Sequence, residues 1–190
     1  VWAPDNKTIA FASDRFGNFD IFTIPVEGGS PKRITYNSGN EKPSSFTPDG
    51  KFILFSGLIS DTPKNAMFPS GGVPELYSIS IDGGRENQIL TSPALFANYS
   101  SDKSLLVYQD QKGYENQWRK HHTSSVTRDI WVYDVKNKKH TKFSSFKGED
   151  LNPVFSSNDK EVFYLSEKTG SMNIWKAPVS DASNLTQIRK

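Results

Sequence analysis

The sequence has no cysteine, only three histidines and no long apolar segment. Without cysteine, disulfide bonds and thiolate metal sites are excluded, although the cellular compartment is not decided. No run of about 18 apolar residues occurs, so we expect no insertion into a membrane. An excess of one charge is also missing: 23 basic and 21 acidic residues give a net charge of +2, and we expect no nucleic-acid partner.

Aromatic residues, in contrast, are abundant. They make up 13% of the 190 residues, and this enrichment favours β-strands. With 35% hydrophobic and 23% charged residues, the composition is that of a globular protein. The first residues, Val1-Trp2-Ala3-Pro4-Asp5, have neither the charged start nor the apolar core of a signal peptide. They resemble the middle of a repeat, and we expect the chain to be part of a longer protein.

A short turn motif recurs four times, and its aspartates are separated by 44, 53 and 57 residues. Each copy precedes an apolar run with the length and composition of a β-strand. The four motifs are Pro4-Asp5-Asn6-Lys7, Pro48-Asp49-Gly50-Lys51, Ser101-Asp102-Lys103 and Asn158-Asp159-Lys160. The apolar runs are 9–12, 52–55, 105–108 and 162–165.

A second strand in each repeat begins with a polar, an aliphatic and an aromatic residue. The four copies are Asp20-Ile21-Phe22, Glu75-Leu76-Tyr77, Asp129-Ile130-Trp131 and Asn173-Ile174-Trp175. Turns that contain Gly or Asn then lead to a third strand. With a short strand before each turn motif, a repeat has four antiparallel strands in about 44 to 57 residues, the size of a propeller blade.

The sequence therefore predicts an all-β chain, a β-propeller region of about four four-stranded antiparallel blades. The expected blades are 1–42, 43–93, 94–150 and 151–190, and together they form a single region. A β-sandwich is the alternative all-β architecture, but a sandwich has no reason to repeat its sequence.

The repeats resemble those of a known family. The segments PDNKTIAFASDRFGNFDIFTIPVEGG and PDGKFILFSG are similar to the propeller repeats of TolB and of tricorn-type peptidases. The segment ENQWRKHHTSSVTRDIWVYDV, followed by GEDLNPVFSSNDKEVFYLSE, is similar to the N-terminal propeller of bacterial tricorn-like serine peptidases. Because propellers of this family have six or seven blades, the resemblance implies a partial propeller here.

The resemblance also implies a role within a peptidase. In the family, a PDZ domain and a peptidase domain follow the propeller and carry the catalytic serine. This chain is thus expected to be non-catalytic and without a cofactor, and to guide or filter peptide substrates or support assembly of an oligomeric particle. Its implied partners are peptide or protein substrates, the remaining blades, and the PDZ and peptidase domains. Because relatives are commonly exported, the periplasm is the expected compartment, with the cytoplasm as the alternative.

Two other functions stay open. A TolB-type propeller would bind proteins with no peptidase attached. An enzyme acting on sugars is the second, because related repeats occur in a family of uronate-cleaving lyases. That chemistry needs a cluster of metal-binding His and Gln, and three histidines, two of them adjacent, fit it poorly.

The connection after the second strand of each blade differs sharply in length. It has five residues in the first and fourth blades, at 15–19 and 168–172, but seventeen at 58–74 and eighteen at 111–128. Loops on a rigid scaffold often carry function. We therefore expect the two long loops to project from one face as a wall or lid.

The third-blade loop holds the candidate binding residues. Its aromatic and guanidinium groups together suit a peptide carboxylate or another acidic group. The candidates are Trp118, Arg119, His121, His122 and Arg128. Packing of the loop onto its blade is the competing structural interpretation.

Neither a metal site nor a catalytic residue is expected in this loop. His121 and His122 are adjacent, so on an extended strand their side chains point in opposite directions. Ser124, His122 and Asp129 invite comparison with a catalytic triad. Triads are defined by geometry, however, and the strand–turn–helix setting of a nucleophile elbow is missing.

Overall fold

The computed structural model of the chain describes residues 1–59, 73–113, 121 and 123–188. These residues form fifteen β-strands and no helix, so none of them belongs to a helix that is long and apolar enough to cross a membrane. The chain divides into two compact units, Val1–Phe96 and Ala97–Lys190. Each unit is described by itself below.

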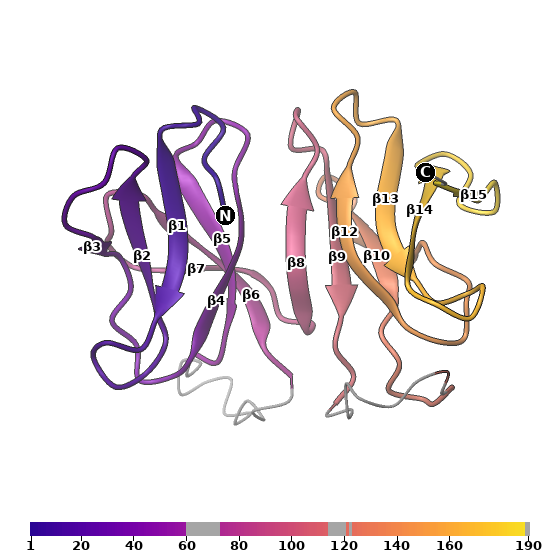
Figure 1. Cartoon of the computed structure of the whole chain (residues 1–190), viewed down its shortest axis with the longest axis horizontal. Helices are drawn as coiled ribbons and strands as arrows, with labels where there is room; N and C mark the ends of the chain where they lie inside the picture. The colour runs from indigo at the N-terminus through magenta and orange to yellow at the C-terminus, as the bar shows by residue number, and fades with distance from the viewer. Residues whose placement is uncertain (60–72, 114–120, 122, 189–190) are drawn as a thin grey trace. The chain divides into compact units, whose positions relative to one another are not determined.

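The first unit contains two antiparallel sheets (Figure 1). Their strands follow chain order, β1-β2-β3 in one sheet and β4-β5-β6-β7 in the other. An isolated bridge between Trp2 and Ile9 adds a short pairing beside β1. The strands are β1 (Thr8–Ser13), β2 (Asp20–Pro25), β3 (Lys32–Arg33), β4 (Glu41–Phe46), β5 (Phe52–Gly57), β6 (Glu75–Ser80) and β7 (Asn87–Leu90).

The second unit repeats the arrangement with the sheets β11-β10-β9-β8 and β12-β13-β14-β15. Strand β8 begins at the end of the first unit and continues into the second. The strands are β8 (Ala94–Tyr99), β9 (Leu105–Asp110), β10 (Ile130–Asp134), β11 (Lys139–Lys142), β12 (Asp150–Phe155), β13 (Glu161–Ser166), β14 (Asn173–Pro178) and β15 (Thr186–Gln187). Four such sheets of sequence-adjacent strands confirm the predicted all-β, propeller-type architecture.

The turn motif is built by a side-chain oxygen that organises the hairpin. Asp102 accepts hydrogen bonds from the Ser100 hydroxyl at 2.7 Å and from the Ser104 backbone N–H at 2.9 Å. The next residue, Lys103, has a left-handed φ of 60°. The same acceptor is supplied in the other sheets by Asp5, Asp49 and Asn158.

One detail of the predicted repeat is corrected by this geometry. The sequence motif aligns Asp159 with the earlier aspartates, but the oxygen that accepts the turn hydrogen bonds belongs to Asn158. Asp159 instead takes the left-handed position, with a φ of 57°. An Asn side-chain oxygen accepts these bonds as an Asp oxygen does, so the turn keeps its form after the shift.

The apolar core of each unit lies between its two sheets. In the first unit, Ile21 and Ile34 pack with Ile53, Phe55 and Ile79, and all five are almost completely buried. In the second unit the corresponding cluster is Val107, Ile130, Phe143, Val162, Tyr164, Trp175 and Ala177. Each blade therefore depends on its neighbour to cover an apolar face.

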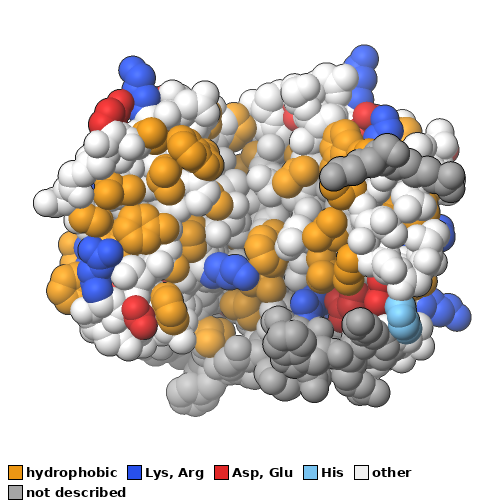
Figure 2. Space-filling model, in the orientation of Figure 1, with side chains coloured by type: hydrophobic (Ala, Val, Ile, Leu, Met, Phe, Trp, Pro, Cys, Tyr) orange, Lys and Arg blue, Asp and Glu red, His pale blue; other side chains and the backbone are white. Residues whose placement is uncertain are grey.

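Large apolar side chains are also exposed on the first unit. Figure 2 shows hydrophobic side chains over the part formed by β1 and β2. Phe16 is 62% exposed and stacks on Phe22, with ring centroids 6.1 Å apart. The guanidinium of Arg33 lies over the rings of both Phe16 and Tyr36. Arg33 therefore covers part of the exposed rings of Phe16 and Tyr36.

Replacing Lys103 by Gly is expected to stabilise the chain. A left-handed backbone strains any residue with a Cβ, whereas the equivalent position in the second sheet is already Gly50. We expect Lys103→Gly to raise the free energy of unfolding by about 1 kcal/mol, measured by urea denaturation. Lys160→Gly is the matched control: its backbone is not left-handed, so that variant should lose stability. A loss in both variants would contradict the argument.

Candidate functional site

An open pocket lies in the second unit where two connections meet, one between β9 and β10 and the other between β11 and β12. Its volume is about 570 Å³. The walls are polar, with lysine amines and hydroxyl groups around one carboxylate and one aromatic ring. The lining residues are Lys112, Thr123, Ser124, Ser125, Thr127, Asp129, Lys142, Ser145, Phe146 and Lys147.

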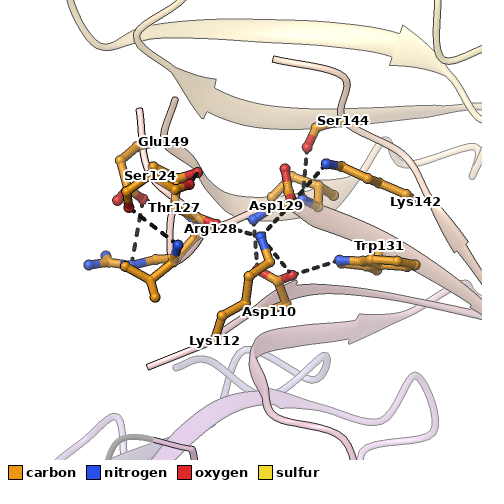
Figure 3. Close-up of polar contacts among 12 residues, drawn as sticks. Asp110, Lys112, Ser124, Thr127, Arg128, Asp129, Trp131, Lys142, Ser144 and Glu149 are labelled. Carbon is orange, nitrogen blue, oxygen red and sulfur yellow. Dashed lines mark hydrogen bonds and ion pairs between the residues drawn. The ribbon is translucent and has the colours of Figure 1, made fainter. Parts of the chain in front are cut away.

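The carboxylate of Asp129 holds two lysines at the base of the pocket (Figure 3). Its Oδ2 atom lies 2.5 Å from Nζ of Lys112 and 2.9 Å from Nζ of Lys142. The Lys112 amine also donates to the Thr127 carbonyl at 2.5 Å and lies 3.3 Å from Oδ2 of Asp110. Burial lowers the pKa of Lys112, but the hydrogen bond to Asp129 and the charges of both aspartates raise it above its usual value overall.

Asp110 joins the two ends of the long loop. It is the last residue of β9, and its Oδ1 accepts the backbone N–H of Asp129 at 2.7 Å. Its Oδ2 accepts the indole N–H of Trp131 at 2.9 Å (Figure 3). The buried carboxylate thus closes the loop at the sheet and sets the position from which Lys112 and Asp129 enter the pocket.

Thr127 links the two connections that form the pocket. Its hydroxyl oxygen lies 2.9 Å from the carbonyl oxygen of Ser124 and 3.2 Å from that of Lys147. Lys147 and Ser145 are exposed on the facing wall. The Thr127 hydroxyl therefore lies within hydrogen-bonding distance of both connections that wall the pocket.

Two of the five predicted binding residues lie in the described part of the chain. His121 is exposed and has a left-handed φ of 54°, and its backbone N–H and ring nitrogen Nδ1 lie 3.3 and 3.7 Å from Oε2 of Glu167. Arg128 is mostly buried, and its Nε lies 3.6 Å from Oε2 of Glu149. Neither residue lines the pocket. Trp118, Arg119 and His122 lie outside the described residues.

The pocket contains cations that the sequence analysis missed. Lys142 ends β11, and Lys147 follows in the connection to β12. The available signal was a run of five lysines without an acidic residue between positions 136 and 147. The long loop by itself does not reveal these lysines, because the connection between β11 and β12 forms the other wall of the pocket.

Neither a triad nor a metal centre forms among the described residues here. Asp129, which a triad would need beside a histidine, contacts two lysines instead. The described residues contain no group of three His, Cys, Asp or Glu side chains placed to hold a metal ion.

Part of the polar cluster belongs to the blade architecture. The backbone N–H of Ile130 donates to the Ser144 hydroxyl at 3.0 Å, and in the first unit that of Ile21 donates to Thr35 at 2.8 Å. The Thr35 hydroxyl in turn donates to Glu41, the first residue of the next inner strand. Since this hydroxyl arrangement occurs in both units, its role is structural.

Asp150, the second unit's counterpart of Glu41, is a fully buried carboxyl group. Neither of its oxygens has a hydrogen-bond donor in good geometry. Burial raises the pKa of Asp150 from 3.8 to about 6, opposed by the nearby hydroxyls of Ser166 and Ser144. Burial also raises the pKa of Glu41. Both acids are therefore disfavoured in their charged form.

Asp150 makes stability depend on pH. Because the pKa of Asp150 is higher in the folded chain than the usual 3.8, folding disfavours ionisation of this carboxyl group. The free energy of unfolding therefore falls as the pH rises from 3.8 to about 6. The loss is complete above a pH of about 6 and amounts to about 3 kcal/mol. We expect Asp150→Asn to raise the free energy of unfolding at neutral pH and to change it little at pH values near 4, measured by urea denaturation.

Asp181→Asn is the control for this effect. The Ser183 hydroxyl and backbone N–H lower the pKa of Asp181, so its charged form is favoured and the variant gains no stability at neutral pH. An Asp150→Asn variant with the same advantage over the parent chain at both pH values would contradict the assignment.

Comparison with known proteins places these features in context. The whole chain, residues 1–190, matches the family described as the tricorn protease N-terminal beta propeller domain. The tricorn protease structure is similar with a TM-score of 0.76 and 21% identity, over 98% of this chain and 18% of that chain. TolB from Acinetobacter baumannii is similar with a TM-score of 0.68 and 19% identity, over 98% of this chain and 41% of that one.

A curated relative covers less of the chain. The uncharacterized protein Atu1656 of Agrobacterium fabrum is 26% identical over 91 residues, which are 48% of this chain and 27% of that protein. At these identities the structural likeness shows the fold alone. The chain spans less than two thirds of the length of each of these three proteins.

Proposed function

The chain belongs to the family of tricorn protease N-terminal β-propeller domains, and from this we propose that it is the non-catalytic propeller module of a tricorn-like peptidase. In this role it guides or filters peptide substrates or supports assembly of the whole protein. Its partners are then peptide or protein substrates, further blades, and PDZ and peptidase domains. The periplasm is the proposed compartment.

The polar pocket of the second unit is the observation that carries the proposal. Peptides present N–H groups, carbonyl oxygens and carboxylates, and the pocket offers matching groups of each kind. Hydroxyls such as those of Ser124 and Ser125 both donate and accept hydrogen bonds, while Lys142 and Lys147 supply positive charge. An open pocket walled by two connections suits an extended chain that passes through rather than a small, enclosed ligand.

We include the loop residues identified from sequence in the same proposal. Trp118, Arg119, His121 and His122 are proposed to contact the peptide from the long loop. The exposed ring of His121 supports a contact role, since 57% of its side chain is accessible. Arg128, held by Glu149, is better placed to position the loop base.

A TolB-like interaction propeller with no attached peptidase is the second candidate. TolB from Acinetobacter baumannii is similar in fold, with a TM-score of 0.68, and this likeness supports the second candidate. The two candidates differ in what accompanies the propeller and share a surface that binds polypeptides.

We expect the chain to bind a short unstructured peptide that has no acidic side chains but a free terminal carboxylate. Lys147→Ala should weaken this binding about threefold, because it removes one exposed charge from the pocket wall. Lys51→Ala, which removes an exposed lysine from the first unit, is the matched control and should bind like the parent. Fluorescence anisotropy with the labelled peptide measures both, and equal affinities of all three proteins would argue against the pocket.

Proteolysis separates the two candidate functions. The chain alone should leave a labelled unfolded substrate such as casein intact, whereas the longer protein that contains it should cleave the substrate. Cleavage by the isolated chain would overturn the non-catalytic assignment. Binding without cleavage by the longer protein would favour the TolB-like candidate.

A further inference from the structure

Strand β11 is an outer sheet edge of unusual composition. It lies at one end of the order β11-β10-β9-β8, and all four of its residues, Lys139 to Lys142, are exposed. The outer strands β3 and β15 have two residues each, and β7, of four residues, has no charged side chain. Among the described outer strands, β11 therefore combines length, exposure and positive charge.

The backbone of β11 presents groups for pairing with a further strand. The N–H of Phe143 donates to the Ile130 carbonyl at 2.7 Å, toward β10. Along an antiparallel strand, the backbone N–H and C=O groups of successive residues point alternately to one side and the other. The backbone groups of Thr141 and Lys139 therefore also point toward β10. The N–H and C=O groups of His140 and Lys142 consequently face away from the sheet, where an extended peptide can bind them.

Positive charge continues along this edge in both directions. The hairpin before β11 carries Lys136 and Lys138; the acid Asp134 accepts two hydrogen bonds from Asn137 and also interacts with the charge of Lys136. From 136 to 147 there are five lysines and no acidic residue. Such a segment attracts a ligand of negative charge.

The edge leads directly into the pocket. Lys142 is both the last residue of β11 and part of the pocket wall, and Ser145 and Lys147 continue that wall. A strand added along β11 would therefore bring its next residues to the lysine amines and hydroxyls of the pocket.

We propose that the β11 edge and the pocket form one docking track for an acidic peptide, which binds as an additional antiparallel or parallel strand. The backbone of His140 and Lys142 pairs with the peptide, and Lys136, Lys139 and Lys147 contact its carboxylates. The inference rests on the proposed function in taking a peptide as the ligand, and it adds the acidic class and the mode of binding. Lysines on an edge strand also discourage aggregation, and the experiment separates that role from binding.

The decisive probe is a fluorescein-labelled peptide in which Glu alternates with Thr. Two further versions carry N-methyl groups on alternate sets of backbone amides, so that only one version blocks the N–H groups that face β11. We expect the two methylated peptides to differ in affinity by about tenfold, because several backbone hydrogen bonds are lost in one of them. Equal affinities of both versions would overturn pairing as a strand.

Two pairs of variants test the same edge from the protein side. Lys136→Gln with Lys139→Gln should weaken binding of the acidic peptide about tenfold, whereas Lys51→Gln with Lys160→Gln should leave it unchanged. His140→Pro removes an outward N–H and should weaken binding, while His140→Ala loses the same ring contact with Tyr108 but keeps the N–H. Equal binding by the two His140 variants would contradict the proposal.

The remaining outcomes distinguish this inference from the proposed function. If the acidic peptide fails to bind but the peptide without acidic side chains still binds, the docking track is wrong and the peptide-binding module stands. If the variant with Lys136→Gln and Lys139→Gln aggregates but binds the peptide like the parent, the lysines only protect the edge strand from aggregation, and the docking track is likewise wrong. If a single-stranded oligonucleotide competes as well as the peptide and methylation has no effect, the edge serves a polyanion instead.

Discussion

Packing of one sheet on the next is the interaction on which the other features depend. A four-stranded blade has two faces, and in each unit the inner faces meet through branched aliphatic and aromatic side chains such as Ile21 with Ile53 and Ile130 with Val162. The burial of apolar surface, rather than any single polar contact, orders the strands. The polar groups at the strand ends are held at fixed positions because these cores are close-packed.

The second unit uses those fixed positions to gather charge at one end of its sheets. The hydroxyl of Ser144 performs a task that Thr35 performs in the first unit, so that contact belongs to the blade. The ion pair of Lys142 with Asp129 also has a counterpart in the first unit, where Arg33 at the end of β3 lies 2.6 Å from Asp20. The third blade keeps these structural contacts of the repeat and places Lys112 and Lys147 beside them. For that reason the pocket and the β11 edge carry the functional argument.

Sequence reasoning succeeded where the pattern was local. The alternation of apolar residues and the turn motifs predicted the strands because both depend on neighbours within a few residues. It erred by one residue at Asn158, since an amide and a carboxylate oxygen serve a turn equally well. It also missed Lys142 and Lys147, which lie outside the loop 111–128. These two lysines line the same pocket as Lys112 only because β9, β10 and β11 are side by side in the sheet. Three of its candidates, Trp118, Arg119 and His122, lie outside the described residues.

The sequence by itself determined the all-β class, the repeat and the family, because hydrophobic alternation, turn chemistry and repeat period are written along the chain. The tertiary structure decided which charges share a surface. Asp110 and Asp129 are separated in sequence, yet both lie beside Lys112, and Asp129 also holds Lys142. Burial within the sheets, together with the nearby charge of Asp129, raises the pKa of Asp150 to about 6. Distance through space and exclusion of water set these energies, and neither is a property of sequence order.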